Sequence, residues 1–226
     1  MTVKRPTRVK HPRTFHLPWS PGATSDDKVH DDWNVNHMFG AQEVVVTEKL
    51  DGENTTIYSD GYMHARSLDG RSHESQTWVR ALAARIARDI PEGWRICGEN
   101  LYAQHSLYYD SLTTYFYVFA IYNEHNRCLS WDETVEWVEA MGLEMVPVLW
   151  RGKWDVDILK RWTAEDPRLD SKVGDEAEGY VVRLVDRFAY DDFAQSTAKY
   201  VRADHITTNK HWKNQRLRPN KLTWRA

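Results

Sequence analysis

The stretch "VTEKLDGENTTIY", residues 46–58, places several charged and polar side chains directly after an apolar run. Its β-branched residues predict one strand over Val44–Lys49 and a second over Thr55–Tyr58. Asp51-Gly52 is typical of a two-residue hairpin turn, so we expect these two strands to pair. Lys49 then has two interpretations, a solvated lysine on a surface hairpin or a nucleophilic lysine in a nucleotide pocket. The rest of the chain has to distinguish them.

The remaining segments mix short strands with a few helices. A helix is predicted over His73–Ile90, because its apolar residues recur at intervals of four on one face. A second helix is predicted to begin at the capping box of Ser130 and Glu133 and to end at Met141. The other predicted elements are a helix over Val156–Trp162 and strands over Tyr62–Arg66, 94–102, 113–122, Met145–Leu149, 178–185 and 197–202. This order lacks the regular alternation of strand and helix found in parallel sheets, so we predict an α+β fold.

The first 36 residues are rich in proline, histidine and charge. We predict that "HLPWSPGATSDDK", residues 16–28, is an ordered loop and neither a strand nor a helix. No linker-like composition or internal repeat follows. We therefore expect a single domain over residues 1–226, with the basic segments 1–36 and 203–226 packed on it or flanking it.

The composition is that of an ordinary globular protein, with 41% hydrophobic and 28% charged residues. Two isolated cysteines, Cys97 and Cys128, argue against a disulfide scaffold and against a zinc site. No apolar run approaches the roughly 18 residues that a membrane span needs. The N-terminus also lacks the apolar region of a signal peptide. We expect no membrane association and a cytoplasmic location.

Basic residues are concentrated at the two ends of the chain, although the net charge is −3. Where aromatic residues such as Trp212 and Trp224 interleave with them, such segments can bind phosphates. Solvated termini explain the same pattern equally well. The residues concerned are Lys4, Arg5, Arg8, Lys10, Arg13, Arg202, Lys210, Lys213, Arg216, Arg218, Lys221 and Arg225.

Four short stretches place a charged side chain at the edge of a predicted apolar strand. They are "EKLDGEN" (48–54), "CGENL" (97–101), "AEGYVVR" (177–183) and "AKYVR" (198–202). A charge that abuts a buried strand costs desolvation free energy unless it is paired or used. One such case is usually a structural ion pair, but four in one chain predict a shared polar cavity that is lined by strand ends.

The order of these residues resembles that of the covalent nucleotidyltransferase superfamily, and most closely that of the ATP-dependent RNA ligases. Lys49-Leu50-Asp51-Gly52 is similar to the KxDG motif that carries the nucleophilic lysine. A four-residue match is weak alone, but six motifs in order, from Lys49 to about Arg202, are a strong match. The residues that carry the resemblance are Glu48, Lys49, Asp51, Gly52, Asn54, Arg66, Glu99, Phe119, Glu178 and Lys199.

The resemblance implies an α+β nucleotidyltransferase (ATP-grasp-like ligase) domain, built on antiparallel sheets with flanking helices. It also implies that Lys49 is the catalytic residue and takes AMP from ATP. The AMP would pass to the 5′-phosphate of an RNA end, and a 3′-hydroxyl would then displace it. A lysine becomes nucleophilic when burial or neighbouring cations lower its pKa, and a Mg²⁺ ion and other Lys or Arg residues would do this for Lys49.

The other residues are implied to hold ATP and a metal ion. Glu178 would hold hydrated Mg²⁺ or Mn²⁺, with Glu99 or Glu48 as further candidates. Arg66 and Lys199 would place positive charge on phosphate oxygens. In the family the carboxylate that Glu99 matches contacts the ribose. The remaining residues implied to bind the nucleotide are Phe119, which would stack on adenine, and Glu48, Asp51, Gly52 and Asn54.

Several of these residues also have a structural interpretation. Glu48 could pair with a nearby base, Glu99 could cap a turn, and Phe119 could belong to an aromatic core strand. We expect Arg183 to be the structural partner of a carboxylate.

Lys199 departs from the family's pattern, which has two basic residues separated by one residue. Val201 occupies the second position, and the next basic residue, Arg202, would face the opposite side of a strand. About 24 residues follow Arg202, which is too few for an OB-fold or a helical domain. A partner protein could therefore recognise the nucleic-acid end.

Three alternatives to an RNA ligase remain open. The chain could be an adenylyltransferase or a DNA nick ligase with the same chemistry, a capping-type guanylyltransferase, or an inactive nucleotide- or RNA-binding module. Intact Lys49, Glu99 and Glu178 argue against an inactive module, because a binding module does not need the lysine.

Overall fold

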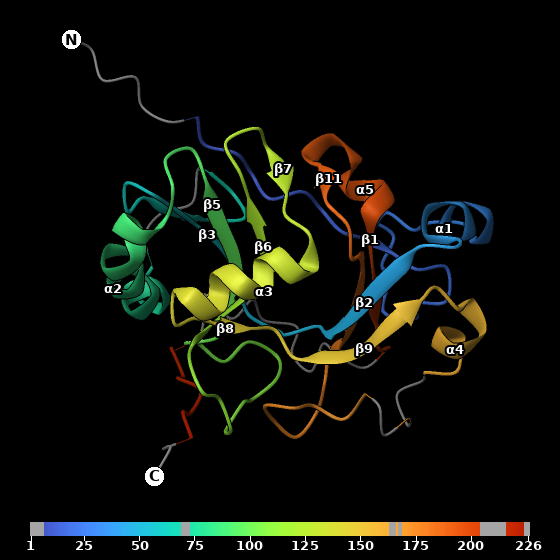
Figure 1. Ribbon diagram of the computed structural model, residues 1–226. Helices are drawn as coiled ribbons and strands as arrows, with labels where there is room; N and C mark the ends of the chain where they lie inside the picture. The colour runs from blue at the N-terminus through green and yellow to red at the C-terminus, as the bar shows by residue number, and fades with distance from the viewer. Residues whose placement is uncertain (1–6, 69–72, 163–165, 167–168, 204–215, 224–226) are drawn as a thin grey trace.

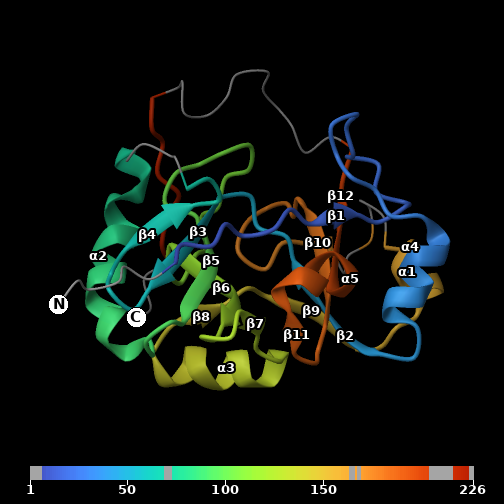
Figure 2. The ribbon, with the colours of Figure 1, turned by 90° about the horizontal axis from the view of Figure 1, so that it is seen from above.

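Two β-sheets form the framework of the computed structural model, which describes residues 7–68, 73–162, 166, 169–203 and 216–223 (Figure 1). Helices α2 and α3 lie beside one sheet, and α1 and α4 lie at the far end of the other (Figure 2). The mixture of mainly antiparallel sheets with a few helices confirms the predicted α+β fold. None of the helices in the described ranges is both long enough and apolar enough to cross a membrane.

The first sheet has the strand order β1-β12-β10-β2-β9 among the described residues. Its strands pair antiparallel, except that β1 pairs with β12 in parallel. Its strands are β1 (Phe15–His16), β2 (Glu43–Glu48), β9 (Val148–Lys153), β10 (Gly179–Leu184) and β12 (Thr197–Val201).

The second sheet has the order β11-β7-β6-β5-β3-β4, and β8 joins it by a parallel pairing with β6. Its strands are β3 (Glu53–Tyr58), β4 (Met63–Ala65), β5 (Arg95–Asn100), β6 (Phe116–Tyr122), β7 (Arg127–Cys128), β8 (Glu144–Met145) and β11 (Phe188–Ala189).

Short helices connect and cover the sheets. The α-helices are α1 (Asp32–Phe39), α2 (Thr77–Ile86), α3 (Trp131–Ala140), α4 (Val156–Lys160) and α5 (Phe193–Ser196). The 3₁₀ turns are η1 (Glu74–Gln76), η2 (Ala87–Asp89) and η4 (Tyr190–Asp192). The predicted helix over His73–Ile90 is confirmed as η1, α2 and η2 in succession. The predicted capping box of Ser130 is confirmed at the start of α3.

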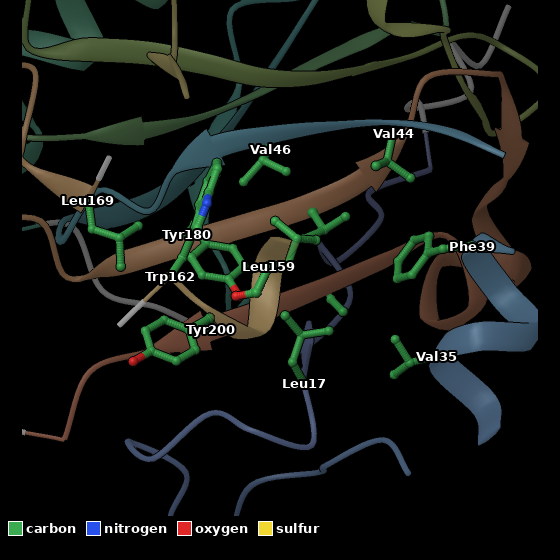
Figure 3. Packing of buried hydrophobic residues seen from close by; sticks show 12 residues of the cluster. Leu17, Val35, Phe39, Val44, Val46, Leu159, Trp162, Leu169, Tyr180 and Tyr200 are labelled. Atoms are coloured by element: carbon green, nitrogen blue, oxygen red, sulfur yellow. The ribbon is translucent and has the colours of Figure 1, made fainter. Parts of the chain in front are cut away.

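Strand β2 is buried on both faces, which explains why its sequence is a continuous valine run. Val44 and Val46 pack in a cluster with Trp162 and with residues of α1 and α4 (Figure 3). Val45 points to the opposite face, where it packs with Leu101 and joins the first sheet to the second. The strand that ends at Lys49 is therefore fixed from both sides.

The predicted hairpin at Asp51-Gly52 is wrong, because β2 and β3 belong to different sheets. β2 pairs with β9 and β10, whereas β3 pairs with β4 and β5. A Cβ atom on Gly52 would lie 2.6 Å from the Asn100 carbonyl oxygen, so glycine allows a close crossing between the sheets. The Asp-Gly signal marks this crossing and not a two-residue turn.

The predicted strand over Met145–Leu149 is also wrong in its extent. Two separate strands occupy this region. Strand β8 of the second sheet ends before Pro147, and β9 of the first sheet begins after it. Proline has no backbone N–H to donate to a ladder, and its carbonyl accepts from the Glu48 N–H at 2.8 Å.

The predicted loop over residues 16–28 is confirmed, because only its first residue, His16, belongs to a strand or helix. Helix α1 begins after this loop, at Asp32, with Asp31 as its N-cap. Asp31 accepts a hydrogen bond from the Asn34 N–H at 2.7 Å, the local signal that would have located this helix.

At the other end of the chain, residues 216–223 pack against the loop over 101–112. Asn220 is buried, and its amide donates to the Leu101 carbonyl and accepts from the Tyr109 N–H. The other residues of the segment 203–226 lie outside the described residues, apart from Ala203.

We predict that Leu159→Ala lowers the free energy of unfolding by about 2–5 kcal/mol, because it leaves a cavity in the core. Leu159 is 0% exposed and packs against the valines of β2. Urea denaturation measures the change. The matched control is Leu68→Ala, at a position that is 38% exposed, with an expected change within about 0.5 kcal/mol. Equal changes would contradict the core assignment.

Candidate active site

A cavity of about 610 Å³ opens between the two sheets. This volume lies in the range of small-molecule sites. The first sheet contributes residues of β2, β10 and β12 to its wall, and the second contributes residues of β3, β5 and β6. The predicted site residues that line the cavity are Glu48, Lys49, Gly52, Asn54, Arg66, Glu99, Phe119 and Lys199. The shared polar cavity predicted from the sequence is therefore confirmed as geometry.

Lys49 follows the last residue of β2, and its side chain meets Glu178 just before β10. The Lys49 amine donates to a Glu178 carboxylate oxygen at 2.5 Å. The antiparallel register pairs Tyr180 with Glu48, and the Lys49 N–H donates to the Gly179 carbonyl at 3.0 Å. The pairing of β2 with β10 therefore places these two side chains together.

In the folded chain by itself, the pKa of Lys49 is not lowered. Burial lowers the pKa of Lys49, but the charges of Glu178 and Glu99 outweigh it, so the pKa is raised. Glu178 carries no charge of the sign that would lower this pKa, so a lowered pKa in the presence of Mg²⁺ stays a prediction. In the folded chain by itself, Lys49 is a charged ion-pair partner.

Glu99, on β5, completes the acidic surroundings of Lys49. It accepts a hydrogen bond from the Gly52 N–H at 3.1 Å. Burial is the main cause that raises the pKa of Glu99 to about 8, and the charges of Glu178 and Asp51 add to it against the lowering effect of Lys49. The carboxyl is therefore readily protonated when no further cation is present.

Glu48 lies on the opposite side of the strand end from Lys49. Its carboxylate accepts from the Ser171 hydroxyl at 2.6 Å and from the Lys172 N–H at 2.9 Å. Burial raises the pKa of Glu48, although these two hydrogen bonds act against the increase. Glu48 thus anchors the segment around 171–172 while it also borders the cavity.

Asp51 does not line the cavity. One carboxylate oxygen accepts from the backbone N–H groups of Ser106 and Leu107, at 2.7 and 2.9 Å. Its own N–H donates to the Tyr109 hydroxyl at 2.8 Å. Asp51 therefore holds the loop over 105–109 against the crossing, and its predicted contact with the nucleotide has no geometric support.

Three predicted nucleotide-binding residues face the cavity from the second sheet. Phe119 on β6 meets the ring of His11 edge-on, with the ring centroids 5.1 Å apart. The side-chain oxygen of Asn54 is buried and has no hydrogen-bond partner within the described part of the chain. Arg66 is exposed and forms no ion pair with another described residue.

Lys199 on β12 faces the cavity, whereas Arg202 does not. Burial and the nearby charge of Lys49 lower the pKa of Lys199 to about 8, against the raising effect of Asp27. Arg202 pairs with Glu176 at 2.6 Å and is absent from the cavity wall. The second basic position of the motif therefore has no basic residue from β12.

The sequence argument missed the N-terminal contribution to the cavity. His11, Pro12, Arg13 and Thr14 line it, because β1 pairs with β12 directly after them. The basic charge of this segment was visible in the sequence, but its long-range pairing was not. His11 is buried, and burial is the main cause that lowers its pKa to about 3.

Arg183 lines the cavity too, but among the described residues it does not pair with a carboxylate as expected. Its guanidinium donates to the backbone carbonyls of Phe119, Leu129 and Leu184. It therefore ties β10 to β6 and to the start of α3.

The family model for RNA ligase matches residues 42–201 of the sequence. This match covers more than half of the chain and includes every residue from Glu48 to Lys199 that was singled out above. The chain belongs to the RNA ligase family. A search of curated protein sequences finds no significant match.

Solved structures of a Naegleria gruberi RNA ligase share the fold at low sequence identity. A lysine-to-alanine variant with ATP and manganese has 17% identity and a TM-score of 0.54, over 88% of this chain and 61% of that one. The complex with pyrophosphate has 18% identity and a TM-score of 0.54, over the same shares. A lysine-to-methionine variant with AMP and manganese has 17% identity and a TM-score of 0.53, over 87% and 62%. The chain thus spans about three-fifths of the length of these structures.

We predict that Asp51→Ala lowers the free energy of unfolding by about 1–3 kcal/mol, because it leaves the Ser106 and Leu107 N–H groups unsatisfied. Urea denaturation measures the loss. Asp110→Ala, at an exposed position, is the matched control and should change stability by less than about 0.5 kcal/mol. If the two variants are equally stable, Asp51 does not anchor the loop.

We predict that His11→Phe flattens the loss of stability in acid. The folded pKa of His11 is about 3, below its usual value of 6.5, so the unfolded chain takes up the proton first. The contribution of His11 to the free energy of unfolding is therefore complete above pH 6.5 and is lost as the pH falls towards 3. Urea midpoints between pH 6.5 and 4 should decline less in His11→Phe than in the wild type. The exposed-site control His125→Gln should follow the wild type, and an unchanged slope in His11→Phe would refute the prediction.

Proposed function

We propose that this protein is an ATP-dependent RNA ligase that forms a lysyl-AMP at Lys49, passes AMP to a 5′-phosphate and seals that end to a 3′-hydroxyl. The observation that carries the proposal is the half-buried Lys49, which lines the cavity and whose amine binds Glu178 at 2.5 Å. A lysine fixed at a strand end, inside a cavity of nucleotide size, is an arrangement that a structural ion pair does not require.

The chemistry follows from the amine. Lys49 loses a proton, its nitrogen bonds to the α-phosphorus of ATP, and the bond to the pyrophosphate oxygen breaks. An oxygen of the RNA 5′-phosphate then attacks the same phosphorus and breaks the bond to Lys49. Last, the RNA 3′-hydroxyl attacks the 5′-phosphate and AMP leaves. Positioning and charge stabilisation contribute most of the catalysis in such phosphoryl transfers.

The cavity residues supply the positions that these steps need. Phe119 presents an aromatic ring for the adenine, and the unpartnered oxygen of Asn54 can accept a hydrogen bond from the nucleotide. Glu99, beside Gly52, is the proposed ribose contact. Arg66 and Lys199 offer positive charge to phosphate oxygens.

A hydrated Mg²⁺ or Mn²⁺ fits the donor set. No cluster of three or more histidine, cysteine, aspartate or glutamate side chains forms a ready metal site among the described residues. Mg²⁺ needs only one or two carboxylates, because it keeps waters and shares substrate phosphates. Glu178 is the proposed ligand. When bound, the metal would neutralise charge on the phosphates.

The Naegleria structures support ATP and a divalent metal as the cofactors, since they were solved with ATP or AMP and manganese. The RNA ends are the proposed partners, and a further protein that recognises these ends stays a prediction, as does the cytoplasmic location. Two-step adenylyltransfer and DNA nick sealing use the same residues, so the acceptor has to be tested directly.

We predict that the wild type retains a covalent label from α-labelled ATP with Mg²⁺ or Mn²⁺, and that Lys49→Ala retains none. The measurement is a denaturing gel with intact mass, where one AMP is gained. Label transfer to RNA or DNA strands with a 5′-phosphate then identifies the acceptor. The control is Lys153→Ala, at an exposed position of β9, which should label as the wild type does.

Absence of label in the folded wild type would overturn the proposal and leave a nucleotide-binding module. Label that persists in Lys49→Ala would assign the nucleophile to another lysine. Transfer to a strand without sealing would reduce the activity to adenylyltransfer.

A further inference from the structure

The N-terminal segment brings a second cation to the cavity beside Lys199. Strand β1 pairs in parallel with β12, with His16 opposite Lys199, and the Leu17 N–H donates to the Lys199 carbonyl at 2.7 Å. Arg13 lies three residues before this pair and lines the cavity. Arg13, from the segment just before β1, and Lys199, from β12, therefore both line the cavity.

Both cations share one carboxylate. The Arg13 guanidinium donates to Asp27 Oδ1 at 3.0 Å, and the Lys199 amine lies 3.9 Å from the same oxygen. The other oxygen, Asp27 Oδ2, accepts from the Thr24 N–H at 3.1 Å and from the Thr24 hydroxyl at 2.9 Å. Asp27 is thus fixed by its own loop and presents one oxygen to two cations.

The charges in this group do not balance. Burial would raise the pKa of Asp27, but the Thr24 hydrogen bonds and Lys199 outweigh it and lower the pKa to about 2, so the group is ionised. His16, 3.5 Å from Asp27, adds no charge near neutral pH, because burial is the main cause that lowers its pKa to about 4. Two cations therefore face one anion, and one positive charge is left for a ligand.

Strand β12 supplies no second basic residue to the cavity beside Lys199. Val201 is buried, and Arg202 pairs with Glu176 outside the cavity. Arg13 is 44% exposed, so its bond to Asp27 alone stabilises the fold little. A guanidinium held in a cavity wall with an unused charge is suited to phosphate oxygens, which it can bind with two N–H groups.

We propose that Arg13 binds the triphosphate of the nucleotide beside Lys199, and that Asp27 positions both side chains. The proposal rests on the proposed function for the identity of the ligand. The triphosphate is favoured over an RNA phosphate because Lys199 also lies close enough to Lys49 for their charges to repel. The Arg13 group thus lies beside the part of the cavity where the α-phosphate would meet the nucleophile, so its ligand would be the β- and γ-phosphates, which AMP lacks.

The test compares ATP with AMP, in the Lys49→Ala background so that no nucleotide is consumed. Calorimetry should show that Arg13→Ala weakens ATP binding by roughly tenfold to a hundredfold, as expected for a charge-assisted hydrogen bond. AMP binding should change by less than about twofold, a split that a merely structural role does not produce. Arg13→Lys should recover part of the loss. Asp27→Asn should weaken the binding of ATP more than that of AMP, because Arg13 and Lys199 lose the carboxylate that positions them both.

The matched control is Lys10→Ala, which removes an exposed basic residue of the same segment from outside the cavity wall. It should bind both nucleotides as its parent does. Equal losses for ATP and AMP in Arg13→Ala, or no loss for either, would overturn the proposal.

A second measurement distinguishes a role of Arg13 in binding ATP from a role in binding RNA. With Lys49 intact, the Arg13→Ala substitution should raise the ATP concentration that gives half-maximal lysyl-AMP formation. The same variant should join pre-adenylated RNA at the wild-type rate. A defect confined to that joining step would overturn the triphosphate assignment. If the wild type forms no lysyl-AMP, the proposed ligase function fails, while the ATP and AMP comparison still decides the role of Arg13.

Discussion

The ion pair between Lys49 and Glu178 is the constraint on which the rest of the site depends. Two charges taken out of water cost free energy unless they meet with good geometry. Here they meet because β2 and β10 pair in one register, which also lets the Lys49 N–H donate to the Gly179 carbonyl. The valines of β2 pack on both faces of the sheet and hold that register. A shift of one residue would exchange the two faces of the strand.

The crossing after Lys49 then brings the second sheet to the same place. Gly52 passes so close to Asn100 and Leu101 that a methyl group would overlap them. Its N–H is thereby within reach of Glu99, and the next residues enter β3 and place Asn54 at the cavity. The cavity is a consequence of this crossing, because the two walls belong to sheets that the segment over 49–52 connects.

The sequence was sufficient where the signal is local. Periodicity located α2, a capping box located α3, and the charges at strand ends indicated the cavity. It was insufficient where a pairing partner lies far along the chain. Asp51-Gly52 satisfies the rules for a hairpin, yet the partners of β2 come from β9 and β10. Strand β1 could not be predicted for the same reason, because its two residues form a strand only through their pairing with β12.

The charges around Lys49 divide the cavity into an acidic and a basic part. Glu178 and Glu99 raise the pKa of Lys49, whereas Lys199 and Lys49 repel each other. Lys49 therefore lies at the boundary between the two parts. A divalent cation suits the acidic part and a polyphosphate suits the basic part, so each ligand compensates the charge that the fold leaves unbalanced. Lys49 is held charged because the carboxylates of Glu178 and Glu99 are its neighbours.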